Sequence, residues 1–161
     1  FNRIFSSTGS EQVGRTFKLP EAVILENVKT VPGIDGHKMS KSYGNIIPLF
    51  ASDEEIKKLV MSIVTDSSGG VPKNVYELHK LFKTEEELAL LYQSKAGKYK
   101  ELKESLAEDV IKFITPLRAK REALAKDKSA VLKIIKDGGA RARARAEAKM
   151  KLVREEVGVT F

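Results

Sequence analysis

The residue types best suited to chemistry lie together in one polar stretch, residues 36–45, which reads Gly-His-Lys-Met-Ser-Lys-Ser-Tyr-Gly-Asn. We call this stretch the lysine–serine loop. Lys38 and Lys41 carry compact cations on long flexible stems, and Ser40 and Ser42 supply hydroxyl donors. Glycines near both ends allow backbone N–H groups to approach an anion closely. These properties predict a loop that binds phosphate groups.

The alternative is that the stretch is an ordinary solvated turn, because lysine, serine and glycine are all common in turns. The order of the residues favours the phosphate loop. Lys-Met-Ser-Lys-Ser at residues 38–42 matches the signature pentapeptide of class I aminoacyl-tRNA synthetases at all five positions. At this stretch the chain therefore resembles that family.

Composition limits the kinds of protein that this chain can be. Its 161 residues are 42% hydrophobic, which is enough for one domain or two small ones and argues against disorder. The absence of cysteine excludes disulfides and thiolate metal sites and suits a reducing compartment, so we expect a cytoplasmic protein. No run approaches the roughly 18 apolar residues of a membrane span, and no signal peptide opens the chain. Because the first residue is Phe1 and not Met, we expect a piece of a longer protein.

The net charge of +7 is unevenly distributed. Residues 1–97 hold equal numbers of basic and acidic side chains, whereas residues 98–161 hold 17 Lys and Arg against 10 Asp and Glu. Segregated positive charge is typical of proteins that contact a phosphate backbone. A lysine-rich, solvated helical surface would show the same composition.

The first part of the chain is expected to contain the non-helical elements. Residues 1–5 read as the end of a helix, and residues 17–24 as an extended or edge segment because they alternate and contain a proline. Residues 28–31 alternate apolar and polar side chains before Pro32-Gly33, which predicts a short strand and a turn. The lysine–serine loop would then follow a strand, where open α/β sheets bind ligands.

From residue 51 onward the pattern is helical. Ser52 with Glu55, and Thr84 with Glu87, form capping boxes that begin two helices, and a shorter helix is expected over residues 74–82 between them. A long amphipathic helix begins near Tyr99, with apolar residues at Leu102, Leu106, Val110, Phe113, Ile114, Leu117 and Leu124.

Two further predictions concern the end of the chain. Pro116 predicts a kink near Ile114 or a break in the long helix. A short helix over residues 130–136 should stop at Gly138-Gly139, and a last helix should run over residues 140–157. On that last helix Arg141, Arg145 and Lys149 share one face, which suits a phosphate backbone, or else forms a solvated face opposite packed alanines.

The flanking sequences resemble tryptophanyl-tRNA synthetases in several places at once. The matching segments are 1–3, 17–20, 31–36, 56–58, 60–67, 139–144 and 153–158. This resemblance implies a mainly α fold: the last strand and the loop of a class I Rossmann-type catalytic domain (residues 1–50), followed by an all-helical tRNA anticodon-binding domain (51–161). The family's upstream His-Ile-Gly-His-type motif is not in this sequence, so we expect a C-terminal part that is inactive alone.

The resemblance also implies a reaction and its site. The family joins tryptophan to the α-phosphate of ATP with release of pyrophosphate, then transfers it to tRNA(Trp). Lys38 and Lys41 would be catalytic, stabilising charge on the leaving pyrophosphate. Ser40 and Ser42 would bind ATP with them, and the backbones of Val31 and Met39 would contact the adenine. Mg²⁺ would be bound through the ATP phosphates, because no carboxylate cluster suggests a protein-built metal site.

The helical part would bind the anticodon end of tRNA(Trp), whose unpaired bases can be stacked and read. Candidate phosphate contacts are Arg118, Lys120, Arg121, Arg141 and Arg145. The tryptophan pocket would lie in the N-terminal half of the parent protein. The parent protein would be a homodimer, and this part of it alone is expected to be a monomer. Two alternatives stay open: a tyrosyl-tRNA synthetase, and a non-catalytic helical RNA-binding module.

Overall fold

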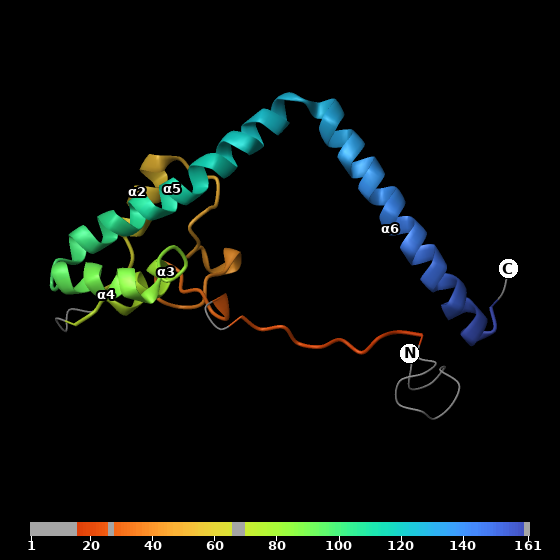
Figure 1. Cartoon of the computed structure of the whole chain (residues 1–161), viewed down its shortest axis with the longest axis horizontal. Coiled ribbons are helices and arrows are strands. Elements are labelled where there is room, and N and C mark those ends of the chain that lie inside the picture. Colours follow the sequence, from red (N-terminus) through yellow and green to blue (C-terminus); the bar gives the residue numbers. More distant parts are fainter. Residues whose placement is uncertain (1–15, 26–27, 66–69, 160–161) are drawn as a thin grey trace. The chain divides into compact units, whose positions relative to one another are not determined.

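A computed structural model describes residues 16–25, 28–65 and 70–159 of the chain, and these residues are mainly helical (Figure 1). This confirms the mainly α fold. The elements in order are η2 (Lys41–Tyr43), α2 (Asp53–Met61), α3 (Lys73–His79), α4 (Glu85–Ser94), α5 (Tyr99–Lys126) and α6 (Lys128–Val157). Among the helices in the described residues, none is long and apolar enough to cross a membrane. The predicted helix end over residues 1–5 lies outside the described residues.

The described chain divides into two compact units. One unit is Ile24–Glu122, which contains the lysine–serine loop and the helices α2 to α4 with most of α5. The other contains residues 16–23 and 123–159 and consists largely of α6. The predicted functional boundary near residue 50 stays a prediction.

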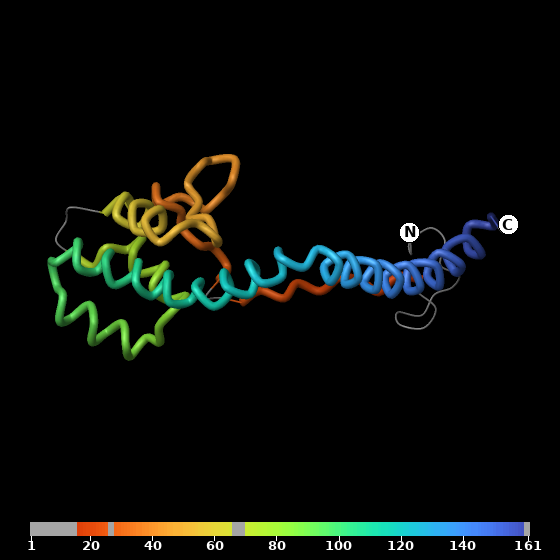
Figure 2. Tube along the Cα trace, turned by 90° about the horizontal axis from the view of Figure 1, so that it is seen from above, coloured from red at the N-terminus to blue at the C-terminus, as the bar shows by residue number. Residues whose placement is uncertain are grey.

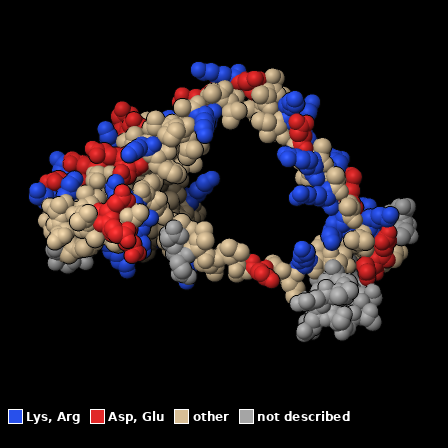
Figure 3. Space-filling model, viewed as in Figure 1, with Lys and Arg blue, Asp and Glu red and all other residues tan. Residues whose placement is uncertain are grey.

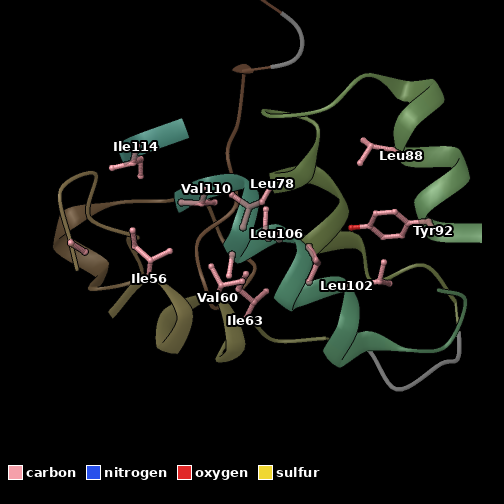
Figure 4. Packing of buried hydrophobic residues seen from close by; sticks show 13 residues of the cluster. Ile56, Val60, Ile63, Leu78, Leu88, Tyr92, Leu102, Leu106, Val110 and Ile114 are labelled. Atoms are coloured by element: carbon pink, nitrogen blue, oxygen red, sulfur yellow. The ribbon is translucent and has the colours of Figure 1, made fainter. Parts of the chain in front are cut away.

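The unit Ile24–Glu122 has a continuous apolar core (Figure 4). Each helix contributes the face that its apolar spacing predicts, because side chains three and four positions apart lie on one side of a helix. The buried hydrophobic residues are Ala51 before α2, Ile56, Val60 and Ile63 from α2 and the turn after it, Val75 and Leu78 from α3, Leu88 and Tyr92 from α4, and Leu102, Leu106, Ala107, Val110 and Ile114 from α5.

The two helix starts that the capping residues predict are present. The Ser52 hydroxyl oxygen accepts a hydrogen bond from the Glu55 N–H at 3.2 Å, at the beginning of α2. At the beginning of α4, the Thr84 hydroxyl accepts from the Glu87 N–H at 3.4 Å, and the Glu87 carboxylate accepts from the Thr84 N–H at 2.9 Å. Each cap satisfies N–H groups that have no partner inside the helix.

Helix α5 runs without a break through Pro116, so the predicted break is wrong. A proline removes one N–H from the helix and crowds the turn before it. Here buried Ile114 and the paired Arg118 hold the helix on both sides of the proline. Tertiary contacts therefore outweigh the local cost.

Helix α6 likewise runs unbroken through Gly138 and Gly139, so the predicted stop and the separate short helix are wrong. Both glycines keep negative φ, whereas Gly158 has φ 77° and its N–H caps the carbonyls of Arg154 and Glu155. Strong helix formers surround the glycine pair, and their propensity exceeds its cost. The left-handed glycine that ends the helix is Gly158.

The predicted strand over residues 28–31 is also wrong. The described residues form no strand; they contain one isolated antiparallel bridge, between Pro32 and Lys38. A strand needs a neighbouring strand to satisfy its backbone groups, and alternation along the sequence does not supply one. Residues 17–24, where an extended or edge segment was predicted, lie outside helices and ladders (Figure 1).

Candidate functional site

The lysine–serine loop projects from the helices of its unit (Figure 2, orange). Antiparallel backbone hydrogen bonds hold the first part of the loop against residues 31–33. The Met39 N–H donates to the Val31 carbonyl at 2.8 Å, and the Gly33 N–H donates to the His37 carbonyl at 2.7 Å. The second half of the loop forms the single turn η2, which Gly44 ends with φ 67°. Because a side chain is strained at such a φ, glycine is the residue that fits this position best.

Asn45, the last residue of the loop, is buried between the loop backbone and residues 33–35 and is 2% exposed. Its Oδ1 accepts from the Ser40 N–H at 2.8 Å, and its Nδ2 donates to Asp35 Oδ1 at 2.8 Å and to the Lys38 carbonyl at 3.2 Å. The Asn45 carbonyl accepts from the Ile34 N–H at 3.0 Å. The partners determine the orientation of the amide, because an N–H needs an acceptor while a carboxylate and a carbonyl need a donor.

The base of the loop is also attached to the chain between α2 and α3. The Val64 N–H donates to the Ile34 carbonyl at 2.8 Å, and Asn74 Nδ2 donates to the Val64 carbonyl at 2.9 Å. Gly36 has φ 83°, and a Cβ there would lie 2.6 Å from Asn74 Nδ2. Hydrogen bonds therefore connect the residues at the start of the loop to the segment after α2 and to α3.

The loop presents two cations and two hydroxyl groups to solvent. Lys38 and Lys41 are exposed, and within the described part of the chain neither forms an ion pair. The hydroxyl oxygens of Ser40 and Ser42 lie 2.8 Å apart in a hydrogen bond. Exposed ammonium and hydroxyl donors on one loop suit an anion with several oxygens, such as a polyphosphate.

The carboxylate of Asp35 accepts hydrogen bonds from two residues of the loop, His37 and Asn45. The hydrogen bond from Asn45 is the main cause that lowers the pKa of Asp35, with a smaller contribution from the His37 N–H at 3.0 Å. Asp35 is therefore an anion over the neutral pH range, and it accepts from both arms of the loop.

Val31 and Met39 are half-buried, and their side chains point toward the helical core. They line an apolar cavity of about 160 Å³ together with residues of α3 and α5, including Leu78 and Leu106. Because the Met39 N–H is bonded to the Val31 carbonyl, the groups left for an adenine are the Val31 N–H and the Met39 carbonyl. Their expected role in adenine binding stays a prediction.

The five candidate tRNA contacts have different surroundings. Arg118 pairs with Asp53 and with the Ala51 carbonyl, and the Arg121 guanidinium lies 5.1 Å from the centre of the Phe50 ring. Lys120 is exposed. On α6, Arg141 and Arg145 line one surface pocket of about 260 Å³, and Figure 3 shows Lys and Arg side chains along much of this helix.

Lys149 does not share the surroundings of the two arginines on its expected face. Its Nζ donates to the Thr16 carbonyl at 2.7 Å and lies 5.9 Å from the centre of the Phe17 ring. The structure thus assigns Lys149 an intramolecular contact inside its unit.

Sequence reasoning missed Asn45, although it noted the residue behind the pentapeptide. The signal in the sequence is the Gly44-Asn45 pair directly after the serines. Glycine permits a left-handed turn, and the asparagine side chain can bond neighbouring backbone groups, so the pair is typical of a closed loop. Its partners at residues 35, 38 and 40 become evident only when the turn is closed.

The chain was compared with known proteins. The family model described as tRNA synthetases class I (W and Y) matches residues 3–131. A tryptophan–tRNA ligase of Xanthomonas axonopodis pv. citri is 42% identical over 98% of this chain and 39% of its own length. One from Rhodopirellula baltica is 37% identical over 91% of this chain and 48% of its own length.

A solved structure gives the same result. The tryptophanyl-tRNA synthetase of Campylobacter jejuni, complexed with ADP and tryptophan, superposes with a TM-score of 0.74 at 36% identity, over 91% of this chain and 49% of that one. The chain thus spans between about two fifths and one half of the length of these relatives. The predicted resemblance is confirmed, and the chain belongs to the class I tRNA synthetase family of the tryptophan and tyrosine enzymes.

Proposed function

We propose that this chain is part of a tryptophan–tRNA ligase and supplies its mobile ATP-phosphate loop and its tRNA-binding helices. The observation that carries the proposal is the lysine–serine loop itself: a hydrogen-bonded base with Lys38, Lys41 and two serine hydroxyls exposed above it. The relatives described above, all named for tryptophan, support tryptophan over tyrosine.

In the activation step the tryptophan carboxylate attacks the α-phosphate of ATP, and pyrophosphate leaves. Negative charge then grows on the leaving oxygens, and ammonium groups stabilise it best when they are already aimed there. Lys38 and Lys41 have this role in the proposal, and Ser40 and Ser42 donate hydrogen bonds to phosphate oxygens. Flanking glycines at positions 36 and 44 allow the loop to close and open.

Mg²⁺ would enter bound to the phosphates and would neutralise part of their charge. Among the described residues, no group of three or more His, Asp and Glu side chains is placed to hold a metal ion. The lysines and hydroxyls of the loop are donors that suit phosphate oxygens and not the cation, so they fit a cation that is shared with the nucleotide.

The helical residues are proposed to contact tRNA(Trp). Lys120, Arg141 and Arg145 are exposed cations that suit phosphate groups, whereas Arg118 and Arg121 already contact other parts of the protein. The tryptophan pocket would belong to the part of the relatives' length that this chain does not cover. The parent protein is proposed to be a cytoplasmic homodimer.

The deciding experiment is amino-acid-dependent exchange of pyrophosphate into ATP by the full-length protein, with tryptophan and tyrosine compared. Exchange with tryptophan alone supports the proposal. Exchange with tyrosine would keep the mechanism and change the substrate. Failure with both, together with retained RNA binding, would leave a non-catalytic helical RNA-binding module or a class I synthetase of another specificity.

A further inference from the structure

We propose that Asn45 is the positioning residue that sets the backbone from which Lys38 and Lys41 reach the phosphates; this inference rests on the proposed function. Asn45 is buried and does not itself carry a group toward solvent, since it is 2% exposed. Its effect would be transmitted through the two lysines.

The first support is the hydrogen bonding of a buried amide. Burying an amide without partners costs free energy, whereas this side chain uses both Nδ2 hydrogens and one acceptor site of Oδ1. Each bond holds a different point of the loop: the carboxylate of Asp35, the carbonyl of Lys38 and the N–H of Ser40. The backbone is therefore held at Lys38 and directly before Lys41.

The second support is that the amide has no room to shift. A Cβ on Gly33 would lie 2.5 Å from Asn45 Cγ and 2.6 Å from its carbonyl oxygen, so Asn45 lies against the bare backbone of Gly33. Its own carbonyl is bonded to the Ile34 N–H. A side chain confined in this way fixes the geometry of the groups that it bonds.

The consequence is pre-organisation. A loop whose base is ordered before the nucleotide arrives loses less conformational entropy on binding and presents its cations in one arrangement. Exposed lysine stems can still follow the leaving group, because the hydrogen bonds of Asn45 hold the loop backbone and not the ammonium groups.

The test uses the full-length protein with Asn45→Ala, and with Thr84→Ala as a control for stability. Thr84 caps α4 by two hydrogen bonds, so its loss lowers stability without touching the loop. For Asn45→Ala we expect kcat of pyrophosphate exchange to fall by about tenfold to a hundredfold, the loss typical of a small misplacement, with the KM for the amino acid unchanged. Thr84→Ala should keep both values.

Amide hydrogen exchange gives a second measurement. The Ser40 N–H bonded to Asn45 Oδ1 should lose its protection in Asn45→Ala and keep it in Thr84→Ala. Amides in the cores of α2 and α5 follow the overall stability, so their exchange should not distinguish the loop variant from the stability control.

A rescue separates positioning from a general loss of structure. Asn45→Asp places a second carboxylate beside Asp35, because Asn45 Nδ2 lies 2.8 Å from Asp35 Oδ1. The repulsion between the two carboxylates should reduce the rate of pyrophosphate exchange at least as much as Asn45→Ala does. In the double substitution Asp35→Asn/Asn45→Asp, residue 35 carries the amide donor and residue 45 the carboxylate acceptor. The rate of pyrophosphate exchange should then be about tenfold higher than in Asn45→Asp alone. Recovery would be incomplete because the Lys38 carbonyl still lacks its donor.

The proposal is overturned if Asn45→Ala exchanges pyrophosphate as fast as Thr84→Ala, or if the double substitution recovers nothing. A wild-type protein that exchanges no pyrophosphate with either amino acid would instead overturn the proposed function, and this inference with it. The two failures are therefore distinguishable.

Discussion

Arg118 Nη1 lies 2.8 Å from Asp53 Oδ1, which ties the middle of α5 to the first residue of α2. The other guanidinium nitrogen, Nη2, donates to the Ala51 carbonyl at 2.7 Å. Two bonds from one planar group, to the Ala51 carbonyl before α2 and to the Asp53 carboxylate at its start, hold the segment that links the lysine–serine loop to the helical core.

Arg118→Ala should therefore reduce stability more than it reduces RNA binding. We expect a loss of about 2 kcal/mol in the free energy of unfolding, because a half-buried carboxylate and a carbonyl lose charged partners. Arg118→Lys should restore less than half of it, since one ammonium cannot reproduce both arms of the fork. Urea unfolding measures the first effect, and tRNA affinity against salt measures the second. A variant with wild-type stability and a reduced salt slope would assign Arg118 to the RNA instead.

His79 predicts a pH-dependent stability. Its ring is fully buried, its Nδ1 lies 3.0 Å from the Tyr92 hydroxyl, and burial is the main cause that lowers its pKa. The negative charge of Asp109 opposes that shift, and its Oδ2 lies 3.2 Å from His79 Nε2 as an ion-pair contact. Lys83 pairs with the same carboxylate.

A histidine with a lowered pKa in the folded state takes up its proton mainly in the unfolded chain. Stability is therefore complete above the ordinary pKa of 6.5 and falls as the pH drops below it, by at most about 1.4 kcal/mol per pH unit. Urea midpoints measured between neutral and mildly acidic pH should show this slope in the wild-type chain. The slope should be smaller in His79→Gln. Equal slopes in the two proteins would assign the pH dependence to carboxylates.

Local patterns predicted the parts of the fold that depend on near neighbours. The caps at Ser52 and Thr84 and the apolar face of α5 were predictable, because each is decided within one or two helical turns. The pentapeptide was recognisable for the same reason: its chemistry lies in consecutive residues.

The features that the sequence did not reveal depend on contacts between residues far apart in the chain, or on opposing conformational preferences of neighbouring residues. Asn45 acquires its role only when the turn closes and brings Asp35 and Ser40 around it. The strand over residues 28–31 fails because alternation does not provide a pairing partner. Gly138-Gly139 reads as a stop, but nothing forces a left-handed conformation there, and the surrounding helix formers prevail.

Replacing either glycine of the pair in α6 with alanine should stabilise the helix. A Cβ at Gly138 or Gly139 would meet nothing within 4 Å, and both residues are helical. Alanine there reduces the backbone freedom of the unfolded chain and should raise the free energy of unfolding the helix by about 0.5–1 kcal/mol per residue. Amide hydrogen exchange around residues 134–142 should therefore slow by about twofold to fivefold per substitution.

Gly158→Ala is the matched control for this prediction. Gly158 also has open space around it, but its φ is 77°, so alanine would be strained there and the end of α6 should exchange faster. Faster exchange in the variants at positions 138 and 139 would instead favour a helix break at the glycine pair.

Lys41 is the side chain whose loss should affect the chemistry most directly. In the full-length protein, Lys41→Ala should lower the single-turnover rate of amino-acid activation by about 10²–10³-fold, the usual loss when one preorganised donor to a developing charge is removed. The loop itself should stay closed, because Asn45 bonds the backbone and not the Lys41 side chain. Protection of the Ser40 amide should therefore remain at the wild-type level. Lys58→Ala, which removes an exposed lysine from α2, is the control for the change in net charge and should keep the rate. An unchanged rate in Lys41→Ala would remove Lys41 from the phosphate site and leave Lys38 as the cation to test.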